Sequence, residues 1–309
     1  MKISVFYDHI LQASEQSGKS ILTVCREVKE AGIDAVEIRL GNLFGNDEVF
    51  EYLGDAKLEI SCIYEFYDMA GCDEKKHMKK HINTAALVGA KNILVVPGFF
   101  KESNDGCDEE SELNYYSEYS HNYECLKIIF NSSPTVQAMI ENLNYMVEYA
   151  ADKGVTVTVE DFDGHTSPLS TINGVRYFIE HVPGLKHTLD CGNYVFSDED
   201  VLEAWEVLKD NVVHVHCKDR GEDEVSEFVE TEEKRFSTNV ENDGLEKKKF
   251  NKGLASVATG DGYLPISEII AGLKEKDYDG YLAIEHFDAP EQRVCMKRSS
   301  EFLRTIWGK

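Results

Sequence analysis

The sequence of 309 residues lacks a long apolar run. No stretch approaches the roughly 20 apolar residues that a membrane-spanning helix needs. The first ten residues, MKISVFYDHI, hold one lysine and a short apolar run that Asp8 and His9 interrupt, so they lack the apolar centre of a signal peptide. The sequence therefore predicts a cytoplasmic protein without a membrane partner.

Positive charge is also scarce. There are 32 lysines and arginines against 57 aspartates and glutamates, which gives a formal net charge of −25. Proteins that bind nucleic acid neutralise phosphates with Lys and Arg, so a nucleic-acid partner is not expected. The simplest role for the acidic excess is to keep the protein soluble.

Two common motifs are missing. The eight cysteines are scattered without a C-x-x-C pair or a dense framework, which is typical of reduced structural thiols. No G-x-G-x-x-G follows the first apolar run, which argues against an open, doubly wound dinucleotide-binding sheet.

Short β-branched runs alternate with segments of helical spacing. Three helical segments, 20–31, 73–88 and 134–153, are each followed by glycine, a frequent residue at helix ends. The strands are too apolar to face water, which indicates a parallel sheet covered by helices. The eight expected strands are Ile3–Phe6, Ala35–Leu40, Leu58–Tyr64, Asn92–Pro97, Val155–Glu160, Leu185–Asp190, Val212–Lys218 and Tyr281–His286. The pattern predicts an α/β fold, a (β/α)₈ TIM barrel, as one domain over residues 1–309.

Two segments interrupt this rhythm. Residues 101–133 are acidic and rich in tyrosine, and they follow the fourth strand; residues 220–258 are densely charged and follow the seventh. Both leave the barrel at the carboxyl ends of strands, where barrel enzymes build their sites. We expect insertions that form loops, either as a lid over the site or as solvated decoration.

Polar residues end four of the expected strands. In VTVTVE the valines alternate with threonines and Glu160, so Glu160 should face the inner rim of the barrel. The same alternation places Asp190, His216 and Glu285 at the rim. The three carboxylates would repel one another without a cation. Together with the imidazole they form a donor set that suits Mn²⁺, Mg²⁺ or Co²⁺ and can hold Zn²⁺. We predict one divalent metal ion, with Mn²⁺ as the first choice.

Five stretches resemble the xylose isomerase-like superfamily of sugar phosphate isomerases and epimerases: AGIDAVEIRLGN, VTVTVEDF, HTLDCGNY, VVHVHCKDR and TGDGYLPISEIIAGLKEKDYDGYLAIEHF. The resemblance implies that Glu160, Asp190, His216 and Glu285 are the metal ligands, and that Glu160 and Glu285 form the acid/base pair. It implies isomerisation or epimerisation of a small sugar or polyol by proton transfer through a metal-stabilised enediolate. No phosphate-binding loop stands out, which favours an unphosphorylated substrate.

The chain departs from the sugar 3-epimerases of this superfamily at one position. Those enzymes carry a histidine three residues after the metal aspartate, where this chain has Asn193, and their arginine after the metal histidine has an approximate counterpart in Arg220. We treat both as candidate substrate-binding residues. The other candidates, at strand ends or with inward parity, are His9, Tyr64, Glu65 and Lys218.

Two further residues have inward parity on one strand. Glu37 and Arg39 share it in VEIRL, which predicts an ion pair buried inside the barrel.

Other functions remain open at this stage. A lyase on the same scaffold, such as a keto-inositol dehydratase or a keto-glycoside-cleaving subunit, would use the same base. A non-catalytic subunit would be expected to lose a rim ligand, and none is lost. A DNA-repair endonuclease would need a His-rich multi-metal site and a basic groove. The sequence does not decide whether the chain forms a homo-oligomer.

Overall fold

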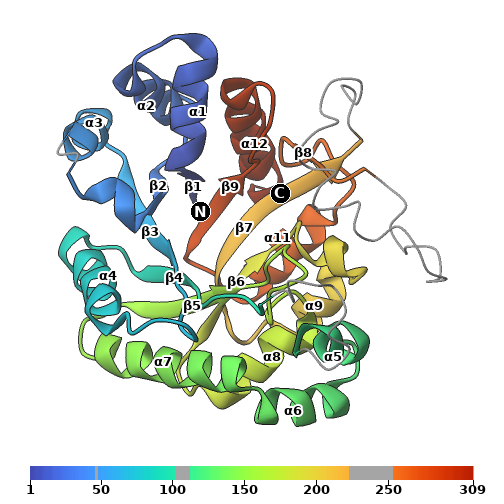
Figure 1. Cartoon of the computed structure of the whole chain (residues 1–309). Coiled ribbons are helices and arrows are strands. Elements are labelled where there is room, and N and C mark those ends of the chain that lie inside the picture. Colours follow the sequence, from blue (N-terminus) through green and yellow to red (C-terminus); the bar gives the residue numbers. More distant parts are fainter. Residues whose placement is uncertain (46–47, 102–111, 223–252, 309) are drawn as a thin grey trace.

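Eight parallel strands close into a barrel in the computed structural model, which describes residues 1–45, 48–101, 112–222 and 253–308 (Figure 1). Neighbours pair in chain order, and the β6–β7 and β7–β9 pairings complete the ring. The ring strands are β1 (Lys2–Phe6), β2 (Ala35–Arg39), β3 (Glu59–Phe66), β4 (Asn92–Val96), β5 (Thr156–Glu160), β6 (Lys186–Asp190), β7 (Val212–Gly221) and β9 (Tyr281–Glu285). The predicted TIM barrel is confirmed. A short strand, β8 (Ala255–Val257), lies outside the ring and pairs antiparallel with the end of β7.

Helices surround the ring (Figure 1). They are α1 (Tyr7–Ser17), α2 (Ile21–Glu30), α3 (Glu48–Ala56), α4 (Lys75–Val88), α5 (Glu112–Tyr119), α6 (Tyr123–Ser132), α7 (Pro134–Ala150), α8 (Ile172–His181), α9 (Val201–Leu208), α11 (Ile266–Glu275) and α12 (Gln292–Trp307), with short 3₁₀ turns η1 (Leu40–Leu43) and η2 (Tyr194–Ser197). Local chemistry fixes several starts. The Ser133 side chain accepts a hydrogen bond from the Val136 N–H, and Pro134 occupies the first turn of α7, where its missing N–H costs nothing.

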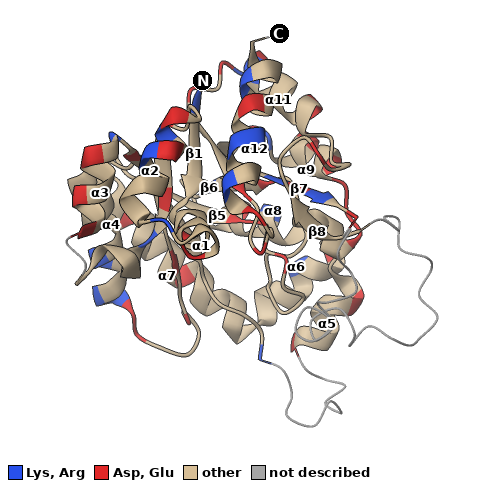
Figure 2. Ribbon diagram, turned by 90° about the horizontal axis from the view of Figure 1, so that it is seen from above, with Lys and Arg blue, Asp and Glu red and all other residues tan. Residues whose placement is uncertain are grey.

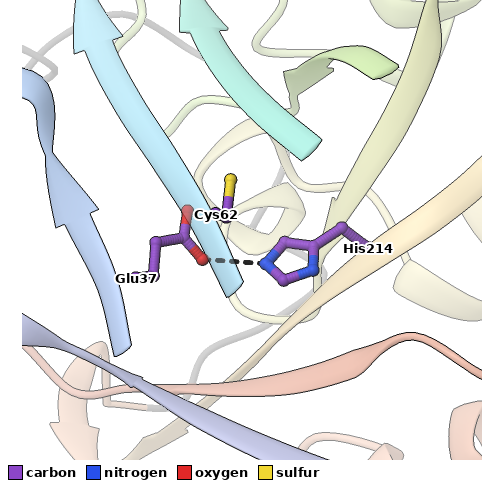
Figure 3. Close-up of side chains that lie close together, drawn as sticks. All are labelled: Glu37, Cys62 and His214. Atoms are coloured by element: carbon purple, nitrogen blue, oxygen red, sulfur yellow. Dashed lines mark hydrogen bonds and ion pairs between the residues drawn. The ribbon is translucent and has the colours of Figure 1, made fainter. Parts of the chain in front are cut away.

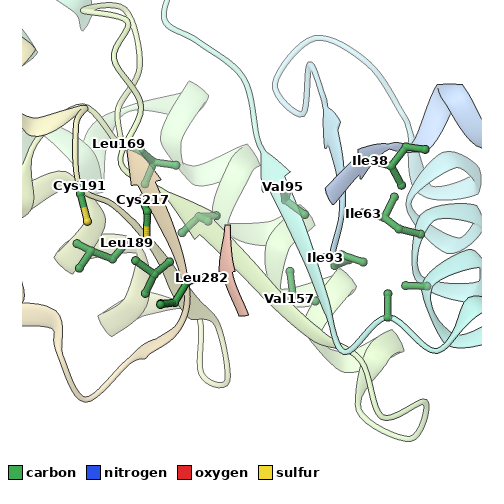
Figure 4. Packing of buried hydrophobic residues seen from close by; sticks show 14 of the residues in the cluster. Ile38, Ile63, Ile93, Val95, Val157, Leu169, Leu189, Cys191, Cys217 and Leu282 are labelled. Atoms are coloured by element: carbon green, nitrogen blue, oxygen red, sulfur yellow. The ribbon is translucent and has the colours of Figure 1, made fainter. Parts of the chain in front are cut away.

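The main hydrophobic core lies between the strands and the helices, and a smaller one lies inside the ring. Alternate strand residues such as Ile63, Ile93 and Leu189 are fully buried in the outer layer (Figure 4). The inner cluster consists of Phe6, Cys62, Tyr64 and Leu94. Because side chains alternate between the two faces of a strand, the valines of VTVTVE pack outward and leave Thr158 and Glu160 for the interior.

The two interrupting segments differ from the expected loops. Residues 112–119 and 123–132 of the first form α5 and α6, and α6 packs against α7 and α8 through buried Leu126 and Phe130. Residues 102–111 and 223–252 lie outside the described part of the chain. The ends of the second segment extend β7 to Gly221 and supply β8. That either segment acts as a lid, and that residues 1–309 are one domain, stay predictions.

Charged residues occur along the helices that surround the ring, as the red and blue segments of α2, α3 and α12 show in Figure 2. They lie on the face opposite the apolar stripe that each helix packs against the barrel. Over the described residues, no helix is both long enough and apolar enough to cross a bilayer.

One buried carboxylate fixes the loop between β8 and α11. Asp219, at the end of β7, accepts hydrogen bonds from the backbone N–H groups of Arg220, Gly260, Gly262 and Leu264 over 2.9–3.2 Å. A carboxylate that satisfies four backbone donors ties the G-D-G turn to the rim strand that carries His216.

We expect Asp219→Ala to lower the free energy of unfolding by roughly 2–4 kcal/mol, because it leaves buried N–H groups unpaired. Urea unfolding followed by circular dichroism measures this. Asp55→Ala, at a solvent-exposed aspartate of α3, is the control and should change stability by less than about 0.5 kcal/mol. Equal stability of the two variants would show that the Asp219 contacts do not hold the loop.

Candidate metal centre and active site

Four side chains from adjacent rim strands meet at the carboxyl end of the barrel. Glu160, Asp190 and Glu285 end β5, β6 and β9, His216 lies in the middle of β7, and each is at most 8% exposed. Each offers a ligand atom, and these atoms all lie within 4.8 Å of one another. The strand register explains the meeting, because Asp190 pairs with His216 across β6 and β7.

The donor atoms converge on one point. The His216 Nδ1 atom lies 3.1 Å from Glu160 Oε2, 3.1 Å from Glu285 Oε2 and 3.6 Å from Asp190 Oδ2. His216 Nδ1, Asp190 Oδ2 and Glu285 Oε2 are buried and make no hydrogen bond of good geometry in the described structure. Buried lone pairs facing one another are costly unless a cation lies between them, so these residues fit a divalent metal ion with oxygen and imidazole ligands.

Glu37 fixes the orientation of the metal-facing histidine from beneath. Its carboxylate accepts a hydrogen bond from His214 Nε2 at 2.8 Å and lies 3.3 Å from His216 Nε2. Figure 3 shows Glu37 from β2 facing His214 from β7, with Cys62 of β3 beside them. When His216 donates its Nε2 hydrogen to Glu37, its Nδ1 lone pair is left to face the three carboxylates.

The predicted Glu37–Arg39 ion pair is wrong. Arg39 ends β2 at the mouth, where its side chain is 49% exposed and donates to Glu65 at 3.0 Å. A guanidinium there keeps its hydration, whereas the buried Glu37 finds two imidazole donors inside the ring. Burial alone would raise the pKa of Glu37, but His216 and His214 outweigh it and hold this pKa well below its usual range. Glu37, Cys62 and His214 could also approach a cation, yet Glu37 already has its two hydrogen-bond donors.

The two candidate acid/base carboxyls have opposite electrostatic surroundings. Burial, reinforced by the negative charges of Glu285 and Asp190, raises the pKa of Glu160 to about 7. Burial also opposes ionisation of Glu285, but Lys218 and His216 outweigh it and lower its pKa to about 2. Without metal, the pair therefore consists of one carboxyl that readily holds a proton and one that stays ionised.

Lys218 is the cation beside this cluster. Its Nζ lies 2.6 Å from Glu285 Oε1 and 3.3 Å from Asp190 Oδ2, and it donates to Asn193 Oδ1 at 2.8 Å. Burial lowers the pKa of Lys218, but Asp190 and Glu285 raise it above its usual value overall. Asn193 in turn donates to the Asp161 carbonyl, so it positions Lys218 at the rim.

The remaining predicted contacts lie around the centre with other partners. His9 lies in the first turn of α1, is fully buried, and accepts a hydrogen bond from the His286 backbone N–H at 2.9 Å. The Tyr64 hydroxyl donates to Asp8 Oδ2 at 2.8 Å. Glu65 accepts from Arg39, and His77 of α4 lies 3.5 Å from its carboxylate.

Arg220 is held by backbone groups. Its Nε donates to the Gly192 carbonyl at 3.1 Å and its Nη1 to the Leu254 carbonyl at 2.9 Å and to Ser256 Oγ at 3.2 Å. Its guanidinium also stacks 4.8 Å from the ring of Phe196. These contacts favour a role in holding β7, β8 and the loop after β6 together, and substrate binding by Arg220 stays a prediction.

One residue next to the centre was not predicted from the sequence. Asp161 follows Glu160 and is buried, and its Oδ1 accepts the Asp190 backbone N–H at 2.9 Å. Burial and the charge of Asp190 raise its pKa well above the usual value. Two consecutive acids in VEDF were the available signal, but alternation assigns the second one outward, so only the loop geometry reveals its contact.

Glu37→Gln should weaken metal binding about 10–100-fold, because an amide presents an N–H group to one of the two histidines and loosens the orientation of His216. Calorimetric titration with Mn²⁺ measures the affinity. Glu199→Gln, at another buried carboxylate that contacts His121 and the Ile172 N–H, is the control and should retain wild-type affinity. Unchanged affinity in Glu37→Gln would exclude this positioning role.

Metal affinity should rise with pH between about 6 and 8, by up to tenfold per pH unit for each proton released. Protons compete with the cation at Glu160, whose pKa is about 7, and at His216. Burial lowers the pKa of His216, but Glu37 and the rim carboxylates outweigh it and raise this pKa well above the usual value. Below these pKa values both groups hold protons, so affinity falls as pH falls. Titrations in buffers of different ionisation enthalpy count the protons released; pH-independent affinity would contradict the site.

Comparison with known proteins identifies the family and the fold. The family described as xylose isomerase-like TIM barrel matches residues 25–306. Inosose dehydratase from Clostridium perfringens is 33% identical over 96 residues, which cover 31% of this chain and 28% of that relative. The matched part is thus less than a third of the relative's length.

Two solved structures share the fold. A D-tagatose 3-epimerase-like protein superposes with a TM-score of 0.64 at 18% identity, covering 100% of this chain and 98% of that one. The IOLI protein with a bound zinc atom superposes with a TM-score of 0.62 at 14% identity, with the same coverage. At these identities the superpositions speak for the fold alone. Since the family match spans most of the sequence, the chain belongs to the xylose isomerase-like TIM barrel family.

Proposed function

We propose that this protein is a divalent-metal-dependent isomerase or epimerase that acts on a small sugar or polyol. The observation that carries the proposal is the pair Glu160 and Glu285, two buried carboxyls whose Oε2 atoms each lie 3.1 Å from His216 Nδ1 within one cluster of metal-type donors. A reaction that moves a proton off a carbon and back needs one group that accepts it and another that donates.

The proposed metal site is the set Glu160, Asp190, His216 and Glu285. When bound, the cation would polarise a carbonyl and the adjacent hydroxyl of the substrate, which acidifies the C–H bond between them. The hard oxygen donors favour Mn²⁺, with Mg²⁺, Co²⁺ and Zn²⁺ as alternatives. A family neighbour holds zinc, which agrees with a single divalent ion.

The side chains have distinct proposed roles. Ionised Glu285 accepts the proton. The Lys218 ammonium, whose Nζ lies 2.6 Å from Glu285 Oε1, stabilises the negative charge of this carboxylate. Glu160 returns a proton from the other face of the substrate. The proposed substrate contacts, of which Lys218 and Asn193 share a hydrogen bond, are His9, Tyr64, Glu65, Asn193, Lys218 and Arg220.

A dehydratase is the second candidate, because the curated relatives in this family include inosose dehydratases. The first step is shared: the base removes the proton beside the carbonyl. The hydroxyl on the next carbon then leaves as water, with its proton supplied by the acid. Analysis of the product separates the two, since an epimerase keeps the mass of the substrate and a dehydratase loses one water.

Glu160→Gln and Glu285→Gln should each slow solvent exchange about 10²–10⁴-fold, because an amide of the same shape cannot transfer the proton. A panel of ketoses and keto-polyols incubated with the Mn²⁺-loaded protein in D₂O should gain deuterium beside the carbonyl, as followed by NMR. The matched control is Glu59→Gln, at the opposite end of the barrel, which should exchange at the wild-type rate. Exchange that persists in both rim variants would rule these residues out as the acid and base.

A further inference from the structure

A row of aromatic rings leads from the metal centre to the mouth of the barrel. The Phe6 ring packs edge-on against the metal-facing His216 with centroids 5.0 Å apart, and Tyr64 lies 5.5 Å from Phe6. Beyond Tyr64, the Phe66 centroid is 6.3 Å away. These spacings are typical of packed aromatic pairs, so the rings form one continuous wall.

The outer end of this wall is a group of three rings, Phe66, Phe99 and Phe162, which we name the aromatic shelf. Phe162 lies 6.0 Å from Phe66 and 5.3 Å from Phe99, both edge-on. The shelf rings come from the carboxyl ends of β3, β4 and β5, the same end of the barrel as the metal centre.

Strand alternation explains why the shelf faces the mouth. Phe66 continues the inward series of Cys62 and Tyr64 on β3. Phe162 follows Glu160 by two residues, so it lies just beyond the proposed acid. The shelf is therefore the next surface that a molecule held at the metal centre would meet on this side.

The shelf is open to solvent, with the Arg39 guanidinium 5.4 Å from the Phe66 ring. Phe66 is 39% exposed and Phe99 37% exposed, although apolar rings of this size gain from burial. The facing wall, from β6 and β7, is polar: Lys218, Asn193 and Arg220 lie there and already have partners. The mouth thus has one polar side and one aromatic side, whose rings stand edge-on to one another.

We propose that the aromatic shelf binds a second ring attached to the unit held at the metal centre. Flat aromatic faces bind the apolar face of a sugar ring or an aryl ring, and the successive contacts from His216 through Phe6 and Tyr64 place the shelf beyond a single chelated unit. The substrate is then a glycoside with two rings, and not a free monosaccharide. This inference rests on the proposed function, because it takes the metal centre as the place of the first ring.

Binding of three glycosides to the full chain loaded with Mn²⁺ tests the shelf. We expect phenyl β-glucoside, cellobiose or both to bind about tenfold more tightly than methyl β-glucoside, which lacks a second ring. A preference for the phenyl compound alone identifies an aryl ring, and a preference for cellobiose alone identifies a sugar ring. Equal affinity for all three, or no detectable binding of any, overturns the proposal.

Variants assign the preference to the shelf. Phe162→Ala and Phe66→Leu should each reduce it to less than about threefold, since leucine keeps apolar bulk but lacks a flat face. Phe50→Ala removes an equally exposed phenylalanine, 43% exposed on α3, and should keep the full preference. A preference that survives in both shelf variants contradicts the assignment.

Metal affinity and solvent exchange, measured on the same proteins, separate the two proposals. Wild-type Mn²⁺ affinity in the shelf variants shows that the metal centre is intact. Ring preference without Mn²⁺ binding or solvent exchange would contradict the proposed function while leaving the shelf as a ring-binding surface.

Discussion

Three carboxylates held around one imidazole in a buried space are the constraint on which the site depends. Two like charges about 4 Å apart repel by roughly 4 kcal/mol even at an effective dielectric constant of 20. The chain counters this repulsion with Lys218, which contacts two of the three, and with a Glu160 that can hold a proton near neutral pH. A divalent cation would remove the repulsion directly, which is why metal binding and local electrostatics cannot be separated here.

Three buried acids, Glu37, Asp161 and Asp219, hold the proposed metal ligands and the adjoining loop in place. Glu37 reaches His214 and His216, so a carboxylate on β2 determines how a histidine on β7 presents its other nitrogen. Asp161 does the same for the backbone at Asp190, and Asp219 for the loop beyond His216. Each of these acids is buried and engaged, so the rim geometry depends on residues that do not face the substrate.

The mouth of the barrel above this centre has polar side chains on one side and aromatic rings on the other. Lysine, asparagine and arginine lie on the β6 and β7 side, while Phe6, Tyr64 and the aromatic shelf lie on the β1, β3, β4 and β5 side. A polar wall orients hydroxyl groups, and a flat apolar wall accepts ring faces. Substrate choice in this chain is therefore expected to depend on residues beyond the four proposed metal ligands.

The sequence by itself determined the alternation of strands and helices, the barrel and the four donor residues at its rim. The reason is that side-chain alternation along a strand, and the number of residues between successive strands, can be read locally from the sequence. It also placed Glu37 on the inner face. Only the tertiary structure decided the partner of Glu37, since β2 and β7 meet across the ring and nothing local distinguishes Arg39 from two distant histidines. It likewise showed that Arg220 is held by backbone carbonyls, that α5 and α6 replace an expected loop, and that Asp161 bonds to the backbone of Asp190. Such contacts join residues far apart in the chain, so their energies depend on ring closure and not on the order of residues within any one segment.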